Sequence, residues 1–340
     1  MRVAILEKPY IFAIKDIEVP TLGSGDVLIK VTSTGICGSE LHAYRGLHQT
    51  KIPPVVLGHE LEGRVAQVGR DVKGVTLGSR VTVLPQLTCG RCTYCRREQP
   101  NLCDEKTMLG TRLWPGSFAE YLVAPAPLVF PLPDGMPDDI GTLIEPLAVG
   151  IHAVHRAGVT QGESVLVLGS GAIGLATAIA AKATGATIVI ATDVRDYNLQ
   201  KAREVGATHT ANVRSEDVVA LARSLTDGMG VDRAMVAVDA PGVLDQAIGA
   251  TRKQGTIGLI AIFTRPVTFN LQPARSAEQV LVGCTTYDEG EFRGALALAG
   301  ASPAIMAALL TQHFDLGDVA RAFEMAINRS EDMVRIVIHS

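Results

Sequence analysis

Four cysteines lie close together in the first third of the chain. They follow the spacing C-x2-C-x2-C-x7-C and occur at Cys89, Cys92, Cys95 and Cys103. Four thiolates on so short a loop complete a tetrahedral zinc shell without an open position, so the spacing predicts a structural zinc ion. Two alternatives are a zinc ribbon that contacts nucleic acid, which the lack of a basic run disfavours, and a redox-switched thiol cluster.

A second set of possible ligands is spread over three short segments. Taken singly, each residue has an ordinary explanation. A lone cysteine near a strand end is usually a core residue, a histidine after glycine is usually in a turn, and a glutamate is favoured at the start of a helix. Together they offer one soft and several harder ligands, the mixture of a catalytic zinc that keeps one position open. The candidate ligands are Cys37, His59, Glu60 and Glu145. Ser39 and His42, in the same segment as Cys37, are further candidate catalytic residues.

A glycine-rich turn predicts a dinucleotide site. Residues 169–174 read G-S-G-A-I-G, between an apolar strand expected at 164–168 and a helix expected at 172–183. The glycines permit a tight turn, close approach of the pyrophosphate and close helix packing, and the helix N-terminus faces the phosphates. The alternative is a glycine-rich turn that binds no nucleotide. The predicted cofactor-binding residues are Gly169, Gly171, Ile173, Gly174, Asp193 and Arg195.

Asp193 and Arg195 point to different forms of the cofactor. Asp193 lies 19 residues after Gly174, at the end of the second expected strand. Its carboxylate accepts hydrogen bonds from the adenosine ribose and repels a 2′-phosphate, which favours NAD over NADP. Arg195 is the residue type that accommodates that phosphate, so it argues in the other direction.

The character of the chain changes near residue 145. Residues 1–145 are rich in glycine, proline and valine and read as short strands with turns. Beyond them, apolar strands alternate with helices, which indicates a parallel, doubly wound sheet in an α/β protein. We expect two or three short helices after residue 288 and a last strand at 334–338. The expected elements of the middle region are strands at 164–168, 187–191, 234–238 and 257–260 and helices at 172–183 and 197–205.

Bulk properties exclude several classes of protein. The 340 residues are 47% hydrophobic and 19% charged, which suits two globular domains rather than a disordered chain. The net charge is −4, so a nucleic-acid partner is not expected. The first residues lack the long apolar stretch typical of a signal peptide, and no apolar run is long enough to cross a membrane. Clustered cysteines suit a reducing compartment. We therefore expect a cytoplasmic protein.

These segments, in this order, resemble the zinc-containing medium-chain dehydrogenase family. The resemblance covers essentially the whole chain: the Cys37–His42 segment, the G-H-E at 58–60, the four-cysteine lobe and the glycine motif. The segment from Ile144 is similar to polyol and 2,3-butanediol dehydrogenases, while segments 193–199 and 115–121 are also similar to L-threonine 3-dehydrogenase. That branch usually has an aspartate where this chain has Glu145, which favours a polyol or diol substrate.

The resemblance implies a domain plan and a set of cofactors. A GroES-like catalytic domain is expected from residues 1–145 and 288–340, with a zinc lobe at about 86–104, and a Rossmann NAD-binding domain from 146–287. Cys37 and His59 are the implied catalytic zinc ligands, joined by Glu60, Glu145 or both in alternation. Two zinc ions per chain, NAD, a small alcohol substrate and a homodimer or homotetramer follow from the resemblance.

The resemblance also implies a mechanism. Hydride leaves an alkoxide more easily than a neutral alcohol, so the zinc would bind the alcohol oxygen and lower its pKa. Ser39 would take the proton, the nicotinamide ribose would pass it on, and His42 would release it at the surface. Hydride would move to C4 of NAD and leave a ketone. The ordinary alternative for Ser39 and His42 is a helix cap and a surface imidazole.

Two other functions compete with this one. L-threonine 3-dehydrogenase is the second enzyme hypothesis, and a non-catalytic binding or structural protein on the same fold is the hypothesis of another class. The intact candidate ligands argue against the non-catalytic protein. Other histidines have no ligand-like partner nearby in sequence. They are His48, His152, His155, His209 and His313. Of these, His152 and His155 share one face of an expected helix and are expected to brace the cleft.

Overall fold

The computed structural model of the chain describes residues 1–328 and 331–340. By its internal contacts the chain divides into two compact units. One unit joins Met1–Glu145 to Ala299–Ser340, and the other is Pro146–Leu298. Within the described residues, no helix has the length and hydropathy needed to cross a membrane.

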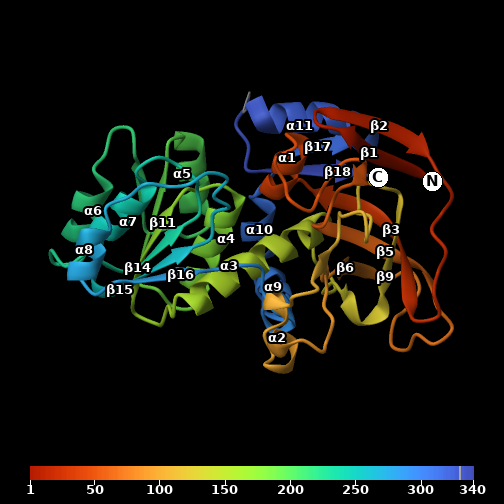
Figure 1. Cartoon of the computed structure of the whole chain (residues 1–340), viewed down its shortest axis with the longest axis horizontal. Coiled ribbons are helices and arrows are strands. Elements are labelled where there is room, and N and C mark those ends of the chain that lie inside the picture. The colour runs from red at the N-terminus through yellow and green to blue at the C-terminus, as the bar shows by residue number, and fades with distance from the viewer. Residues whose placement is uncertain (329–330) are drawn as a thin grey trace. The chain divides into compact units, whose positions relative to one another are not determined.

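The Pro146–Leu298 unit is built on a six-stranded parallel sheet (Figure 1). The strands lie in the order β13-β12-β11-β14-β15-β16, which is the 3-2-1-4-5-6 order of a Rossmann doubly wound sheet. Their bounds are β11 Ser164–Leu168, β12 Ile188–Asp193, β13 His209–Asn212, β14 Val231–Val236, β15 Thr251–Leu259 and β16 Val280–Gly283.

Helices alternate with these strands, as the sequence predicts. Helix α4 spans Ala172–Ala183, the range expected from its apolar pattern, and eight of its residues are buried. Strands β13 and β16 were not expected, because they form the two edges of the sheet and each has only four residues. The other helices of this region are α3 Ile144–Arg156, α5 Asp196–Glu204, α6 Val218–Ser224, α7 Val243–Ala250, α8 Leu271–Ser276 and α9 Glu289–Ala301.

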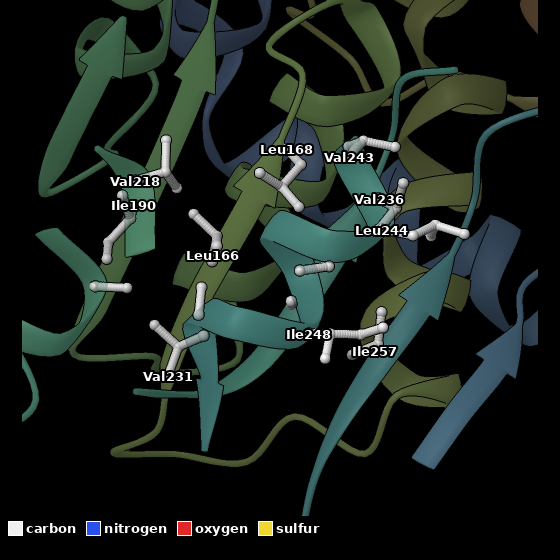
Figure 2. Close-up of a cluster of buried hydrophobic side chains, with 14 of the residues drawn as sticks. Leu166, Leu168, Ile190, Val218, Val231, Val236, Val243, Leu244, Ile248 and Ile257 are labelled. Atoms are coloured by element: carbon white, nitrogen blue, oxygen red, sulfur yellow. The ribbon is translucent and has the colours of Figure 1, made fainter. Parts of the chain in front are cut away.

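The core of this unit lies between the sheet and its helices. Figure 2 shows Leu166 and Leu168 of β11 together with Leu244 and Ile248 of α7, all buried. Because β11 is covered on both faces, its sequence is a continuous apolar run rather than an alternating one. The packing fixes the carboxyl end of β11, where the glycine motif begins.

The other unit is mainly β, as expected. Its largest sheet has the order β10-β6-β5-β3-β18-β17, with β9 also paired to β3, and a smaller sheet has the order β2-β1-β4. The bounds are β1 Arg2–Lys8, β2 Ile11–Asp16, β3 Asp26–Gly35, β4 Val55–Val56, β5 Leu61–Val68, β6 Arg80–Val83, β7 Gln86–Leu87, β8 Thr107–Met108, β9 Tyr121–Pro125, β10 Val129–Pro131, β17 Leu310–Asp315 and β18 Arg335–His339.

The C-terminal strands complete this sheet. Strand β18 pairs antiparallel with β3, so that Val337 faces Gly35, and it pairs parallel with β17 on its other side. In Figure 1 the blue strands β17 and β18 lie in the same sheet as strands from the start of the chain. The last strand was expected, whereas β17 was not, because its half-buried residues lack a clear apolar alternation.

Short helices connect these strands. Helix α1, which follows β3, was not expected from the sequence, since seven residues are too few to establish a helical period. The bounds are α1 Gly38–Tyr44, α2 Thr93–Arg96, η1 Pro100–Leu102, η2 Ala126–Leu128, η3 Ile140–Leu143, α10 Pro303–Ala307, η4 Leu316–Asp318 and α11 Val319–Asn328.

The second boundary between the units falls within α9, between Leu298 and Ala299. The sequence placed it near residue 288. The start of α9 belongs to the Pro146–Leu298 unit because Glu291 hydrogen-bonds His152 and His155 of α3.

Candidate active site

Cys37 lies at the junction between a long strand and a short helix. Strand β3 ends at Gly35 and α1 begins at Gly38, so Cys37 is the N-cap of α1. Its backbone N–H donates to Oε2 of Glu40 at 3.0 Å, which is one half of a capping box. This bond fixes the direction in which the cysteine leaves the strand.

The loop that carries His59 is tied to the same glutamate. Gly58 has a φ of +103°, and a Cβ there would lie 2.6 Å from Oγ of Ser117, so the position requires glycine. The N–H of Gly58 donates to Oε1 of Glu40 at 2.8 Å, and Nδ1 of His59 donates to the same oxygen at 2.8 Å. With Nδ1 bonded to a carboxylate, Nε2 of His59 remains to serve as a metal ligand.

The structure brings Cys37, His59 and Glu60 together. Their ligand atoms lie within 4.8 Å of one another, and His59 and Glu60 are buried. Glu145 is buried as well, but among the described residues it is not part of this group. A thiolate, an imidazole and a carboxylate fit zinc, which takes all three ligand types.

Glu60 has a second partner from the far end of the chain. Its carboxylate forms a buried ion pair with Arg335 of β18. A Cβ at Gly35 would lie 2.7 Å from Oε2 of Glu60 and 3.0 Å from Nε of Arg335. Glycine at position 35 therefore makes room for this pair.

Opposing effects set the charges of the group. Burial alone would neutralise Glu40, but Lys51 and His59 outweigh it and hold the pKa of Glu40 at about 2. Burial and Lys51 lower the pKa of His59, yet Glu40 and Cys37 raise it to about 9. Burial also works against the Cys37 thiolate, whereas His59 stabilises it and brings the pKa to about 6. The cysteine is thus prepared to act as a thiolate, the form that binds metal.

Ser39 and His42 follow Cys37 on α1. They are three residues apart, so they share one face of the helix. Oγ of Ser39 accepts a hydrogen bond from Nζ of Lys51 at 3.1 Å, and Lys51 itself is buried. Nδ1 of His42 is buried and has no hydrogen-bond partner among the described residues. An unpaired buried imidazole nitrogen is a position where a further donor or acceptor is required.

The four clustered cysteines converge on one point. Their sulfur atoms lie within 4.8 Å of one another, and all four thiols are free. The Cys89–Cys103 and Cys89–Cys95 sulfur separations are 3.6 and 4.0 Å. A tetrahedral zinc ion with bonds of about 2.3 Å would separate its sulfurs by about 3.8 Å. Backbone N–H groups also point at the sulfurs, from Cys89 to Cys103 and from Cys92 to Cys89, each at 3.3 Å.

The three glycines of the motif have distinct structural roles. Gly169 has a φ of +94°, which its turn requires. A Cβ at Gly174 would overlap the carbonyl oxygen of Gly169, so glycine there permits close helix packing. Gly171 is the N-cap of α4 and has open space where a Cβ would be, which leaves its backbone accessible. This cradle fits a pyrophosphate.

Asp193 lies at the end of β12, and its carboxylate also holds the surrounding loop. Oδ2 accepts from the N–H of Ser170 at 2.9 Å and from the side chain of Asn198 at 3.1 Å. Oδ1 accepts from the N–H groups of Val194 and Arg195 at 2.8 and 3.0 Å. Asp193 therefore joins the glycine turn to the start of α5 and is held rigidly beside it.

Two family profiles match the chain along these features. Residues 23–134 match "Alcohol dehydrogenase GroES-like domain", and residues 172–301 match "Zinc-binding dehydrogenase". Sorbitol dehydrogenase of Bacillus subtilis is 32% identical over 100% of this chain and 97% of its own length. The chain belongs to the zinc-dependent medium-chain dehydrogenases. L-threonine 3-dehydrogenase of Pyrococcus horikoshii is 38% identical over 75% of this dehydrogenase and 74% of its own length.

Solved structures agree with this dehydrogenase over its full length. 2R,3R-butanediol dehydrogenase from Bacillus subtilis superimposes with a TM-score of 0.90 at 31% identity, covering 100% of this chain and 99% of that one. A zinc-binding dehydrogenase from Sinorhizobium meliloti, solved with NADP, gives 0.93 at 27% identity and the same coverages. The expected GroES-like and Rossmann folds are confirmed, and the dehydrogenase is a zinc-dependent oxidoreductase that uses a nicotinamide cofactor.

Three residues of the dehydrogenase site were not predicted. Glu40 carries a recognisable signal, because a glutamate three residues after an N-cap completes a capping box. Lys51 and Arg335 carry none, since their partners in the site are brought to them only by folding.

Three of the other histidines of this dehydrogenase contact residues that are distant in sequence. His152 and His155 bond the two oxygens of Glu291 at 2.9 and 3.2 Å. His313 lies beside His339 and Asp139. The sequence shows no ligand-like partner near these histidines because each partner is distant in sequence and close in space.

Proposed function

We propose that the chain oxidises a secondary alcohol of a polyol or vicinal diol, with NAD as the hydride acceptor. The observation that carries this proposal is the group of Cys37, His59 and Glu60, whose ligand atoms lie within 4.8 Å of one another. Relatives named sorbitol dehydrogenase and butanediol dehydrogenase support the substrate class.

Cys37 and His59 would hold the catalytic zinc, with Glu60 as the third ligand and Glu145 as its alternative. A zinc ion there acts as a Lewis acid that lowers the pKa of an alcohol. Glu40 orients His59 through Nδ1, and Arg335 neutralises Glu60 when that carboxylate does not contact the metal. The chain's own part is therefore to keep three ligands fixed and a further position open.

The proton of the alcohol would leave by way of α1. The hydroxyl of Ser39 receives a hydrogen bond from Lys51, which leaves its own hydrogen and a lone pair for exchange with substrate. His42 lies on the same helix face and has an unpaired buried Nδ1. An imidazole ring can accept a proton at one nitrogen and donate one from the other, so it is suited to pass the proton to water.

The glycine motif and Asp193 would bind the cofactor. The cradle at Gly171 suits the pyrophosphate, and the negative charge of Asp193 opposes a 2′-phosphate. This supports NAD as the preferred form. Ile173 and Arg195 complete the proposed cofactor set. Arg195 is the N-cap of α5, where a 2′-phosphate would also be attracted, so the choice calls for direct measurement.

The four-cysteine lobe would hold a second, structural zinc, giving two zinc ions per chain. Thiolates of this kind must stay reduced, which suits a cytoplasmic location. We also propose that the enzyme is a homodimer or homotetramer, which light scattering on the purified holoenzyme tests directly.

L-threonine oxidation is the second candidate, favoured by the relative from Pyrococcus horikoshii. Threonine requires anchors for both an ammonium and a carboxylate group. This chain has Glu145 where the L-threonine 3-dehydrogenase branch usually has an aspartate, which favours a polyol substrate over threonine.

A substrate panel tests the proposal. Sorbitol, 2,3-butanediol, L-idonate and L-threonine would be oxidised with NAD and with NADP, and reduced cofactor followed by absorbance. We expect a polyol or diol with NAD to give kcat/KM more than ~10-fold above L-threonine. Cys37→Ser should abolish turnover while Cys284→Ser, outside the candidate ligand groups, should not. A clear preference for L-threonine, or no turnover of any diol, would reject the polyol assignment.

A further inference from the structure

Three potential ligands meet on the surface of the Met1–Glu145 and Ala299–Ser340 unit, and none of them belongs to either proposed zinc site. They are Asp139, His313 and His339, here named the β17–β18 histidine cluster. His313 lies in β17 and His339 at the end of β18, whereas Asp139 is the N-cap of η3. Folding thus joins a loop before residue 140 to two strands from the end of the chain.

The ligand atoms face one another. Nδ1 of His313 lies 3.0 Å from Nε2 of His339, and the two rings are nearly parallel, with an interplanar angle of 13°. Oδ2 of Asp139 lies 3.6 Å from the first nitrogen and 3.7 Å from the second. A single carboxylate oxygen therefore faces both imidazole nitrogens.

These separations match those of ligands on one metal ion. With bonds of about 2.1 Å, neighbouring ligands lie about 3.0 Å apart in an octahedral shell and about 3.4 Å apart in a tetrahedral one. The observed 3.0, 3.6 and 3.7 Å describe a triangle of that size. Imidazole nitrogens with a carboxylate favour late first-row divalent cations such as Zn²⁺ and Ni²⁺ over Ca²⁺ or Mg²⁺.

The backbone holds the three residues in this arrangement. Asp139 has a φ of +70°, unusual for a residue other than glycine, and its carbonyl accepts bonds from the N–H and Oγ1 of Thr142 at 3.0 and 2.6 Å. Strand pairing places His339 opposite Asp315, two residues beyond His313. A strained aspartate whose ion-pair partners, among the described residues, are these two histidines indicates a binding site.

Exposure determines what kind of site this is. The side chains of His313 and His339 are 47% and 37% exposed, whereas that of Asp139 is 15% exposed. An ion bound by all three would retain open positions on the solvent side. The cluster therefore differs from the closed four-cysteine shell.

We propose that the β17–β18 histidine cluster is a third metal site, which binds Zn²⁺ or Ni²⁺ reversibly from solution. The ion would connect η3, β17 and β18, three segments that local sequence does not join. Because it binds only the folded arrangement, it would stabilise this unit in proportion to metal concentration.

The test uses holoenzyme with its purified zinc content, dialysed against Ni²⁺, with both metals counted by elemental analysis. We expect one Ni²⁺ per chain with the original zinc retained, and an unfolding temperature raised by roughly 5 °C at saturation. His313→Gln, His339→Gln and Asp139→Asn should each weaken Ni²⁺ binding by more than ~10-fold. Asparagine tolerates the left-handed backbone of position 139, so that variant keeps the fold.

His209→Gln is the matched control, because His209 is a strand histidine whose ring nitrogen is hydrogen-bonded to the neighbouring Thr208 and does not belong to a ligand cluster. It should leave Ni²⁺ binding unchanged, and all four variants should retain the original zinc. The proposal is overturned if no Ni²⁺ binds beyond the retained zinc. It is equally overturned if the three cluster variants bind Ni²⁺ as the unaltered enzyme does.

Discussion

Glu40 and Glu60 lie beside the same cysteine but have different partners. Glu40 accepts hydrogen bonds from Cys37, Gly58 and His59, so it holds the two ligand loops in register. Glu60 instead has a cationic partner in Arg335, which compensates its charge in the interior. The carboxylate of Glu40 is fixed by these bonds and can orient His59. The carboxylate of Glu60 has Arg335 as a partner when it does not bind zinc, which supports its proposed role as a ligand that binds zinc only part of the time.

The unpaired Nδ1 of His42 leads to a prediction about proton release. His42→Gln should slow alcohol oxidation by roughly 10-fold to 10⁴-fold while zinc content and NAD affinity stay the same, because general-base function is lost. Added imidazole should restore part of the rate. Ser39→Ala should be slower still and not rescued, since it removes the group proposed to contact substrate.

A primary isotope effect with deuterated alcohol is the control for that measurement, because cofactor release often limits turnover. An unchanged rate for His42→Gln, under conditions where the isotope effect is fully expressed, would remove His42 from the proton path.

Asp193 leads to a prediction about cofactor choice. We expect the unaltered enzyme to have a higher kcat/KM with NAD than with NADP, and Asp193→Ala to narrow that ratio by removing repulsion of the 2′-phosphate. Because Asp193 also holds Ser170 and Asn198, the variant should lose some NAD affinity as well. A preference of the unaltered enzyme for NADP would mean that Arg195 determines the choice.

At the scale of elements, one glutamate caps α9 and joins it to α3. Glu291 accepts from the N–H of Asp288 at 3.0 Å while Asp288 accepts from the N–H of Glu291 at 2.8 Å, which is a reciprocal capping box. Its two oxygens also bond His152 and His155. Burial opposes the charge of Glu291, but the two histidines outweigh it and hold its pKa at about 2.

This contact should stabilise the fold most strongly at mildly acidic pH. The lowered pKa of Glu291 contributes stability above its ordinary value of 4.5, and that contribution is lost as the pH falls toward 2. The pKa of His155 is raised by the bond to Glu291, so its contribution is full below its ordinary 6.5 and is lost as the pH rises through the raised value. The two contributions coincide between pH 4.5 and 6.5.

We therefore expect Glu291→Gln to lower the free energy of unfolding by about 1–2 kcal/mol near pH 5.5 and by less at pH 8.5. Denaturant unfolding at the two pH values measures this, with Glu289→Gln as a control on the exposed side of the same helix. An equal loss at both pH values would show that the charged pairing contributes nothing.

At the scale of the whole molecule, the chain leaves one unit, builds the other and returns. Strand β18 lies between β3 and β17, so the last residues of the chain complete the sheet that supports Cys37. Arg335 reaches Glu60 only because of this return. The site with Cys37 therefore depends on residues from both the first and the last part of the chain.

Two ligand groups should give two tightly bound zinc ions per chain. Cys92→Ser should release one ion and lower the unfolding temperature, because a closed shell contributes directly to folding. Cys37→Ser should reduce activity far more than stability. Elemental analysis and thermal unfolding of the two variants measure this, and a single zinc in carefully prepared unaltered enzyme would contradict the proposal.

Spacing along the chain was sufficient for features whose parts are close in sequence. The four cysteines and the glycine motif were recognisable because each occupies one short segment with a geometry that few sequences share. Helix α4 and β11 were predicted from local sequence as well, because elements buried on all sides are encoded by continuous apolar runs.

Only the tertiary structure decided which distant residues meet. It paired Glu60 with Arg335, placed Lys51 beside Ser39 and His59, and gathered Asp139 with two histidines from the last strands. A polar side chain carries no periodic pattern that names its partner, so its role depends on the register of strands far apart in the chain. The ligand types were therefore evident from sequence, while the residues that orient and neutralise them were determined by how β3, β18 and β17 align.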